Sequence, residues 1–314
     1  MTTSVIPIPP SYNENEKLCV KDTQSYLHFL ESENVQTVMT TAGTSQFGLL
    51  DTHEILDFNR SVSEFNGTKI LGVPQIPTIN LKQFILDSVC DNNTFFMGLY
   101  PDRFYDNKTV IEYFSRIRDC TKNPIYVHGM FMRAGRGGQW NFTADVLCEL
   151  FDKNIITGIK EEHSDLSQAY NLVVNLPDEL DVIVAGGSMR RHQFLKSAGA
   201  NSFLSGVGNM LPSIENEYCR KIDCGLDVQS ELDIESKLFS VFNKHGWHQS
   251  LRIALSLLQL CCFSDRMPWP TRKEFIVNDI ENVMKGILYR LDRDKKISIK
   301  QFNSIISYLE RERE

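Results

Sequence analysis

The sequence lacks a segment that would insert into a membrane or direct the chain across one. No apolar run approaches the roughly 20 residues that a membrane-spanning helix needs. The first residues, MTTSVIPIPP, lack the basic start and the long apolar core of a signal peptide. We therefore expect a cytoplasmic protein with no membrane partner.

A strongly basic segment is missing as well. The chain has 314 residues and a formal net charge of −7. Proteins that bind nucleic acids usually present a basic patch, so the charge argues against a nucleic acid partner. The contents of hydrophobic residues, 42%, and charged residues, 23%, are normal for a globular protein.

The eight cysteines show no spacing that is typical of a metal site or a redox motif. They are scattered, and no C-x-x-C pair occurs. Reduced thiols in a cytosolic protein are therefore favoured over disulfides. The segment DRDKKISIKQF at 292–302 is weakly similar to a calcium loop, but it has neither the glycine nor the final glutamate of that motif. We expect no metal ion and no cofactor.

The first two thirds of the chain instead contain short apolar segments that alternate with amphipathic helical patterns. The expected strands are 4–9, 37–41, 69–74, 94–100, 124–131, 155–160, 181–187 and 202–207. Helical patterns lie between them, as at 52–65. Eight strands, each followed by a helix, predict a closed parallel (β/α)8 barrel, the TIM barrel of the α/β class.

From about Leu211 onward the pattern is helical only. Apolar residues recur at helical spacing in 230–246, 247–262, 272–291 and 298–312. We predict a barrel domain over residues 1–225 and a C-terminal helical region, residues 226–314, that packs on the barrel.

A lysine stands at the end of the sixth expected strand, in the segment NIITGIKEEHSDL. Lys160 follows the apolar Ile155, Ile156 and Ile159 and precedes polar residues. Burial of an ammonium group costs several kcal/mol. Lys160 therefore either reaches solvent from the strand end, or lies in an apolar pocket that favours the neutral amine, which can attack a carbonyl carbon.

Two other expected strand ends are rich in small residues. In a (β/α)8 barrel the active site lies at the carboxyl ends of the strands. Gly43, Thr44 and Ser45 follow the second strand, and their amides and hydroxyls suit a carboxylate or a phosphate. A plain turn is the alternative interpretation. The seventh strand ends at Gly186 and its neighbouring glycine.

The fifth expected strand adds a histidine to the same end of the barrel. Tyr126 and His128 lie on one face of this strand, because side chains alternate along a strand. His128 alone could be a core histidine, but Lys160 on the next strand is close enough for proton transfer. Arg133, in the following loop, could bind an anionic group of a substrate or lie in a solvated loop.

These segments resemble the dihydrodipicolinate synthase and N-acetylneuraminate lyase superfamily of Schiff-base-forming pyruvate enzymes. IITGIKEEHSDL is similar to the family segment G-[IL]-K-[ED], and PIYVHGMFMRAG to the strand-five segment P-x-x-x-Y-N-x-P-x-x-T-G. TAGTSQFGLLDTHE is similar to the segment G-[TS]-T-G-E and the helix start that follows it. The resemblance covers most of the chain and implies that Lys160 is the Schiff-base lysine.

The chain departs from the family pattern at two positions that matter for proton transfer. The proton-shuttling tyrosine of the family falls on His128, with Tyr126 two residues earlier on the same face. The first hydroxyl of the second motif falls on Gly43, whereas Thr44 and the Ser45 amide remain for the substrate carboxylate. The resemblance therefore implies a retained lysine with an altered proton relay.

Three functions are compatible with the sequence. The favoured one is a Schiff-base lyase or aldolase for pyruvate or another 2-oxo acid, in which Lys160 forms the imine and His128 or Tyr126 moves the proton. The alternatives are a non-catalytic sensor or scaffold with the same barrel, and a phosphate- or flavin-binding barrel. The resemblance also implies a homotetramer.

Overall fold

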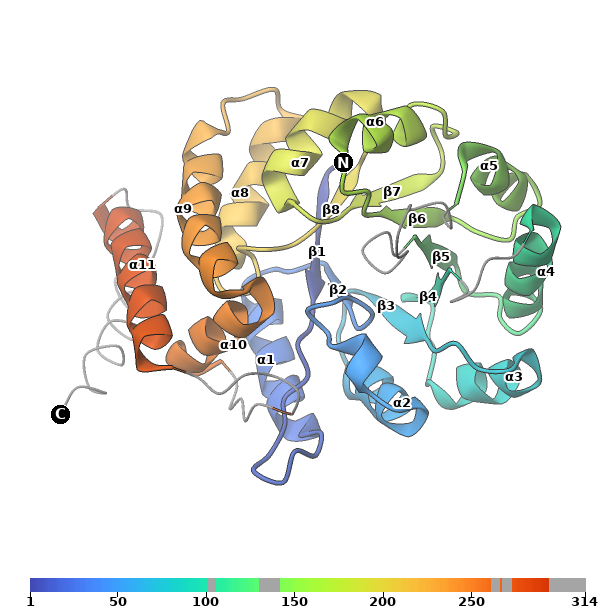
Figure 1. The fold of residues 1–314 in the computed structure, drawn as a ribbon, viewed down its shortest axis with the longest axis horizontal. Coiled ribbons are helices and arrows are strands. Elements are labelled where there is room, and N and C mark those ends of the chain that lie inside the picture. Colours follow the sequence, from blue (N-terminus) through green and yellow to red (C-terminus); the bar gives the residue numbers. More distant parts are fainter. Residues whose placement is uncertain (101–105, 130–141, 261–265, 267–272, 294–314) are drawn as a thin grey trace.

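The computed structural model describes residues 1–100, 106–129, 142–260, 266 and 273–293. The chain forms a closed barrel of parallel strands in which each strand pairs with the next and the last pairs with the first (Figure 1). The strands are β1 (Thr3–Pro7), β2 (Thr37–Met39), β3 (Thr68–Val73), β4 (Thr94–Leu99), β5 (Ile125–His128), β6 (Gly158–Glu161), β7 (Asp181–Val184) and β8 (Ser202–Leu204). The predicted (β/α)8 barrel is confirmed.

An α-helix follows each strand, and these helices surround the barrel (Figure 1). They are α1 (Val20–Ser32), α2 (Thr52–Ser61), α3 (Thr78–Asp87), α4 (Asn107–Arg118), α5 (Ala144–Asp152), α6 (Leu166–Val173), α7 (Ser188–Leu195) and α8 (Pro212–Asp223). The predicted helical extension is confirmed in α9 (Gln229–His245), α10 (Trp247–Leu257) and α11 (Glu274–Arg293). The expected helix at 298–312 lies outside the described residues.

Side-chain caps determine where several helices begin. Asp51 accepts a hydrogen bond from the Glu54 amide, and the Glu54 side chain accepts one from the Asp51 amide, which makes a capping box for α2. Asp106, Thr143 and Asp165 cap α4, α5 and α6 with their side-chain oxygens. Because these caps satisfy the free amides of the first turn, they fix each helix start near the carboxyl end of the preceding strand.

The barrel interior has a polar group at its amino end and an apolar layer above it. The Tyr126 hydroxyl donates a hydrogen bond to Asp181, the first residue of β7. The interior apolar cluster contains Val5, Met39, Ala42, Ile70, Met97, Tyr126 and Ile183. His128 follows Tyr126 by two residues and pairs in register with Lys160. The lysine and the histidine therefore lie toward the carboxyl end, above the apolar layer.

Strand β6 begins later than the sequence indicates. The segment 155–160 was the expected strand, but the amides of Ile155 and Ile156 both donate to the Leu150 carbonyl and so complete the end of α5. Both isoleucines are buried in the outer core instead. The strand then extends one residue past Lys160, because Glu161 pairs in register with Val184. Lys160 is thus inside the strand and is not its last residue.

The predicted domain boundary falls in the loop between α8 and α9, and the division at residue 225 stays a prediction. Helix α10 packs against both α9 and α11. Within the described residues, no helix combines the length and the apolar character that crossing a membrane requires.

Candidate active site

Lys160, His128 and Glu162 converge at the carboxyl end of the barrel. The Lys160 Nζ atom lies 2.7 Å from His128 Nε2 and 3.0 Å from Glu162 Oε2. His128 Nε2 lies 2.7 Å from the same Glu162 oxygen. The exposed fractions are 0% for Lys160 and 2% for His128, so both groups are withdrawn from water. An amine, an imidazole and a carboxylate therefore form one small polar cluster above the apolar layer of the barrel interior.

Glu162 carries a negative charge inside this cluster. Burial by itself raises the pKa of Glu162, but the charge of Lys160 and the contact with the His128 ring outweigh it and hold the pKa well below its usual value. The carboxylate therefore stays ionised. It can stabilise a proton on either Lys160 or His128, because both nitrogen atoms contact the same oxygen.

Alternation along β6 separates the two consecutive glutamates that follow Lys160. Lys160 and Glu162 both point inward, as residues two apart on a strand do. Glu161 points outward, where its carboxylate accepts from Arg191 at 3.0 Å and from the His163 amide at 2.6 Å. Sequence reasoning missed Glu162, although its spacing of two residues from Lys160 was a usable signal.

Of the two predicted proton shuttles, the structure brings only His128 next to Lys160. Tyr126 is one layer lower, and its hydroxyl is bound to the Asp181 carboxylate. Burial and the neighbouring carboxylate raise the pKa of Tyr126 well above its usual value. Gly158, which pairs in register with Tyr126, leaves room for the tyrosine ring, since a Cβ atom there would lie 2.3 Å from it.

The turn Gly43, Thr44 and Ser45 follows β2 at the same end of the barrel. Thr44 and Ser45 are buried, and the turn is closed by a hydrogen bond from the Gln46 amide to the Gly43 carbonyl. The Ser45 hydroxyl donates to the Met39 carbonyl at 3.4 Å. The backbone amides of the turn and the Thr44 hydroxyl are therefore the groups that could meet a ligand here.

Two further polar groups beside this turn are buried without a protein hydrogen-bond partner in the part of the chain that the structure describes. They are the Thr41 hydroxyl and both polar atoms of the Gln46 amide. Thr41 is 1% exposed and Gln46 3% exposed. Buried polar groups are nearly always hydrogen-bonded, so such atoms indicate a place where a polar ligand or water completes the set.

A second histidine reaches the turn from α10. A Cβ atom on Gly43 would lie 3.1 Å from both Cε1 and Nε2 of His248. Burial lowers the pKa of His248 below its usual value; Glu162 acts in the opposite direction, and Lys160 adds to the lowering. Sequence reasoning missed His248, because only the packing of the C-terminal helices brings it to the barrel.

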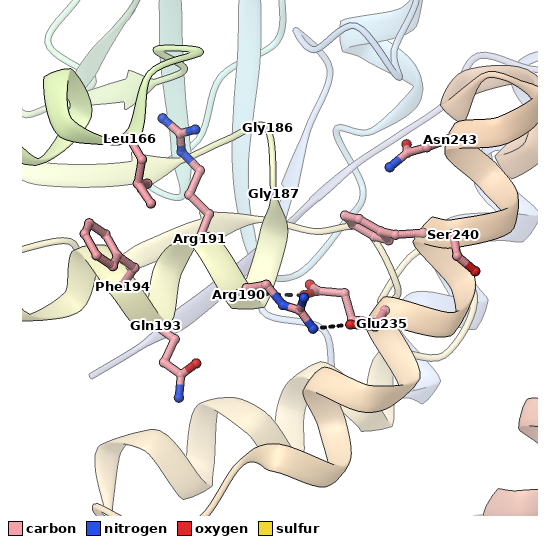
Figure 2. Close-up of a pocket in the computed structure, with 12 residues that line it drawn as sticks. Leu166, Gly186, Gly187, Arg190, Arg191, Gln193, Phe194, Glu235, Ser240 and Asn243 are labelled. Atoms are coloured by element: carbon pink, nitrogen blue, oxygen red, sulfur yellow. Dashed lines mark hydrogen bonds between the residues drawn. The ribbon is translucent and has the colours of Figure 1, made fainter.

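Gly186 borders the cluster from the side of β7. Its φ angle of +78° lies in the left-handed region that favours glycine, and a Cβ atom there would lie 4.0 Å from Glu162 Cγ. Gly186 also lines a cavity of about 880 Å³ between α7 and α9 (Figure 2). A role for Gly186 in substrate binding stays a prediction. Arg133 lies outside the described residues.

The wall of this cavity includes the first turn of α7. The amide of Arg190 donates to the Glu235 carboxylate of α9 at 3.1 Å (Figure 2). The amide of Met189 donates to the same carboxylate at 2.8 Å. Arg191 is bound to Glu161, as described above. The two amides and the Arg191 side chain are groups that could bind an anion at the start of α7. All three already have protein partners. Among the described residues, no group of three or more His, Cys, Asp or Glu side chains is arranged to hold a metal ion.

Curated relatives of this chain are aldolase-type lyases. A 4-hydroxy-tetrahydrodipicolinate synthase from Clostridium perfringens is 28% identical over 171 residues, which are 52% of this chain and 56% of that enzyme. The chain thus spans just over half the length of this relative. A 2-dehydro-3-deoxy-phosphogluconate/2-dehydro-3-deoxy-6-phosphogalactonate aldolase from Sulfurisphaera tokodaii is 20% identical over 251 residues, 77% of this chain and 81% of the aldolase. No family model matches the chain.

Solved structures share the fold over nearly the whole chain. A dihydrodipicolinate synthase from Oceanobacillus iheyensis superimposes with a TM-score of 0.75 at 19% identity and covers 91% of this chain and 96% of its own. A prophage protein of the dihydrodipicolinic acid synthase family from Escherichia coli, solved in complex with pyruvate, has a TM-score of 0.78 at 14% identity, with coverages of 91% and 98%. The resemblance to the dihydrodipicolinate synthase and N-acetylneuraminate lyase superfamily is confirmed.

Proposed function

We propose that this protein is a Schiff-base-forming lyase or aldolase that acts on pyruvate or another 2-oxo acid. The observation that carries the proposal is the buried Lys160 amine, 2.7 Å from an imidazole and 3.0 Å from a carboxylate at the carboxyl end of a (β/α)8 barrel. A lysine with a proton acceptor in contact and little water around it is equipped to attack a carbonyl carbon. The aldolase and synthase activities of the curated relatives support the same reaction class.

The shared carboxylate explains how Lys160 becomes a nucleophile. When the Lys160 ammonium passes a proton to His128 Nε2, the positive charge stays within 3 Å of the Glu162 oxygen, so little electrostatic energy is lost. The neutral amine then adds to the keto carbon and forms a carbinolamine. The imidazolium of His128 returns the proton to the carbinolamine hydroxyl, which leaves as water and gives the iminium ion.

The iminium nitrogen then accepts the electron pair of a bond to C3. In the cleavage direction His128 takes the proton of the 4-hydroxyl group, the bond between C3 and C4 breaks, and an aldehyde and an enamine result. The imidazolium protonates the enamine at C3, and water releases the 2-oxo acid and regenerates Lys160. The synthetic direction reverses these steps. Proton transfer by a positioned side chain typically contributes about 10²- to 10⁴-fold to the rate.

The substrate carboxylate is expected at the turn after β2. The Thr44 hydroxyl and the backbone amides of the turn supply donors. The Thr41 hydroxyl and the side-chain amide of Gln46, which are buried without a partner among the described residues, supply further polar contacts. Arg133 is proposed to hold the far end of the substrate. A homotetramer remains a proposal that follows from the family resemblance, and a cytoplasmic location remains a proposal that follows from the sequence.

The two alternatives receive less support. A phosphate or flavin site at β7 and β8 would use the amides at the start of α7, but the Glu235 carboxylate occupies two of them. A sensor or scaffold would not need a lysine, a histidine and a carboxylate in mutual contact. Imine formation without release of product would nevertheless identify such a sensor.

Borohydride trapping tests the proposal. The protein is incubated with pyruvate, reduced, and digested, and the adduct is located by peptide mass spectrometry. We expect the adduct on Lys160 and its loss in Lys160→Ala. Lys69 is an internal control, because it is also buried but its Nζ atom is bound by Asp91 at 2.7 Å and by the Phe65 carbonyl at 2.9 Å. No adduct with pyruvate or with longer 2-oxo acids would refute the proposed function.

A further inference from the structure

Helix α10 places a histidine against the turn after β2. His248 is the second residue of α10, and its Nε2 and Cε1 atoms lie 3.1 Å from the position that a Cβ atom of Gly43 would occupy. This distance is shorter than ordinary van der Waals contact, so the imidazole fills the space that a side chain at position 43 would need. The absence of a side chain at Gly43 therefore lets the His248 ring pack directly against the turn.

The same imidazole lies within electrostatic reach of the catalytic cluster. Both Lys160 and Glu162 act on the protonation of His248, and they do so with opposite signs. The ring is therefore in contact with the turn after β2 and near enough to the end of β6 to respond to its charges. A 2-oxo acid joined to Lys160 has its carboxylate one bond from the imine carbon, and that carboxylate must lie in the same space if it meets the turn.

We propose that His248 binds the carboxylate of the 2-oxo acid and takes up a proton from solvent when the substrate enters. This inference rests on the proposed function of the barrel. Gly43, Thr44 and Ser45 supply amides and hydroxyls to a carboxylate but no positive charge. A hydrogen bond from a charged imidazolium to a carboxylate is about twice as strong as one between neutral groups.

The physical reason for the proton uptake is a change in the surroundings of His248. In the free protein, burial disfavours the charged imidazolium, and the pKa of His248 is lowered. An incoming carboxylate within hydrogen-bond distance favours the charged form. The binding of an anion and the binding of a proton are therefore coupled. Affinity for the substrate is highest below the lowered pKa of free His248 and falls as the pH rises from that pKa to the higher pKa of the complex.

Three other titratable or charged groups on the elements around His248 have partners of their own. His128 of β5 contacts Lys160 and Glu162. On α9 and α11, which pack against α10, the His245 ring is bound to Asp279 at 2.8 Å. Arg252 of α10 donates to the Pro10 carbonyl at 2.8 Å. We therefore assign the proton that is linked to carboxylate binding to His248.

Histidine NMR on the full-length protein tests the inference. The His248 ring signal is assigned by its loss in His248→Gln, and its titration midpoint is measured alone, with pyruvate, and with propionate. Propionate has the carboxylate but no keto carbon, so it cannot form an imine. We expect a midpoint below 6.5 in the free protein. Either ligand should raise it by about one unit, a tenfold gain in proton affinity.

Binding measurements provide the functional readout. His248→Gln keeps a hydrogen-bond donor but cannot carry a charge. We expect it to weaken pyruvate binding by about tenfold and to abolish the pH dependence of affinity, while trapping at saturating pyruvate still occurs on Lys160. His245→Gln, a matched substitution in the neighbouring helix, should bind pyruvate as the unmodified protein does.

The possible outcomes separate this inference from the proposed function. An adduct on Lys160 together with an unchanged His248 midpoint would overturn the inference and leave the proposed function intact. A propionate-induced rise of the midpoint in a protein that forms no adduct would support the carboxylate site and overturn the Schiff-base function. An unchanged midpoint and no adduct would overturn both.

Discussion

The amine of Lys160 and the imidazole of His128 face each other from adjacent strands, with Nζ and Nε2 2.7 Å apart. The register of β5 with β6 makes them direct neighbours, and the apolar layer below them limits the ways in which water can reach them. Their proximity is set by the barrel backbone and does not depend on a flexible loop. Substitutions at these positions should therefore affect chemistry more than folding.

Replacement of His128 tests the assignment of the proton shuttle. His128→Phe keeps a planar ring but removes the proton acceptor of Lys160. We expect turnover to fall by about 10²- to 10⁴-fold, because the lost step is proton transfer. Steady-state kinetics with the 2-oxo acid identified by trapping would measure this. Activity within a few-fold of the unmodified protein would contradict the assignment.

Tyr126→Phe is the matched test on the same strand face. This change removes the hydroxyl that donates to the half-buried Asp181 carboxylate and leaves the atoms around Lys160 in place. We expect a loss of stability of about 1 to 3 kcal/mol, measured by chemical denaturation, because one carboxylate oxygen loses its donor while the Ser202 hydroxyl still contacts the other. The amount of pyruvate trapped on Lys160 should stay within about twofold of that in the unmodified protein, because Tyr126 lies one layer below His128. A turnover loss as large as that of His128→Phe would instead make Tyr126 the shuttle.

The stabilisation that the ionised Glu162 provides should be lost in acid. Its pKa is lowered in the folded state, so the unfolded chain binds a proton more readily than the folded one. The stabilisation is therefore complete above pH 4.5, the usual value, and is lost as the pH falls toward the lowered pKa. The difference in unfolding free energy between the unmodified protein and Glu162→Gln should shrink below this pH. A constant difference from pH 7 to pH 3 would refute the electrostatic role.

A methyl group on Gly43 should disturb substrate binding. In Gly43→Ala the new carbon would lie 3.1 Å from the His248 ring, which must move by a few tenths of an ångström. We expect the KM for the 2-oxo acid to rise several-fold with a smaller change in kcat. Gly286→Ala on α11 is the control, because a Cβ there meets nothing within 4 Å. That control should gain about 0.5 to 1 kcal/mol of stability and keep its KM.

Local patterns in the sequence were enough to predict the barrel and two members of the cluster. The alternation of apolar segments and helices identified the strands, and the period of two along β5 placed His128 on the inner face. The pattern predicts the start of β6 too early, because Ile155 and Ile156 have the apolar, β-branched side chains of strand residues although their amides complete α5. That error made Lys160 a strand end and hid the inward direction of Glu162.

The contribution of α10 could not be predicted in this way. His248 is distant from β6 in sequence, and the segment around it has the pattern of an ordinary amphipathic helix. Its position depends on how α9, α10 and α11 pack together and against the barrel. Such tertiary packing leaves no signal in a single sequence beyond the absence of a side chain at Gly43.

The ion pair between Glu161 and Arg191 has a mechanical consequence for the nucleophile. Glu161 is held from outside the barrel by α7, while the residues on either side of it, Lys160 and Glu162, are held from inside. The end of β6 and the residue that follows it are thus held from opposite faces at three consecutive positions, which limits rotation of this backbone about the strand axis. In the proposed reaction, Arg191 therefore helps to set the direction in which the amine approaches a carbonyl, although it contacts the outer face of the barrel.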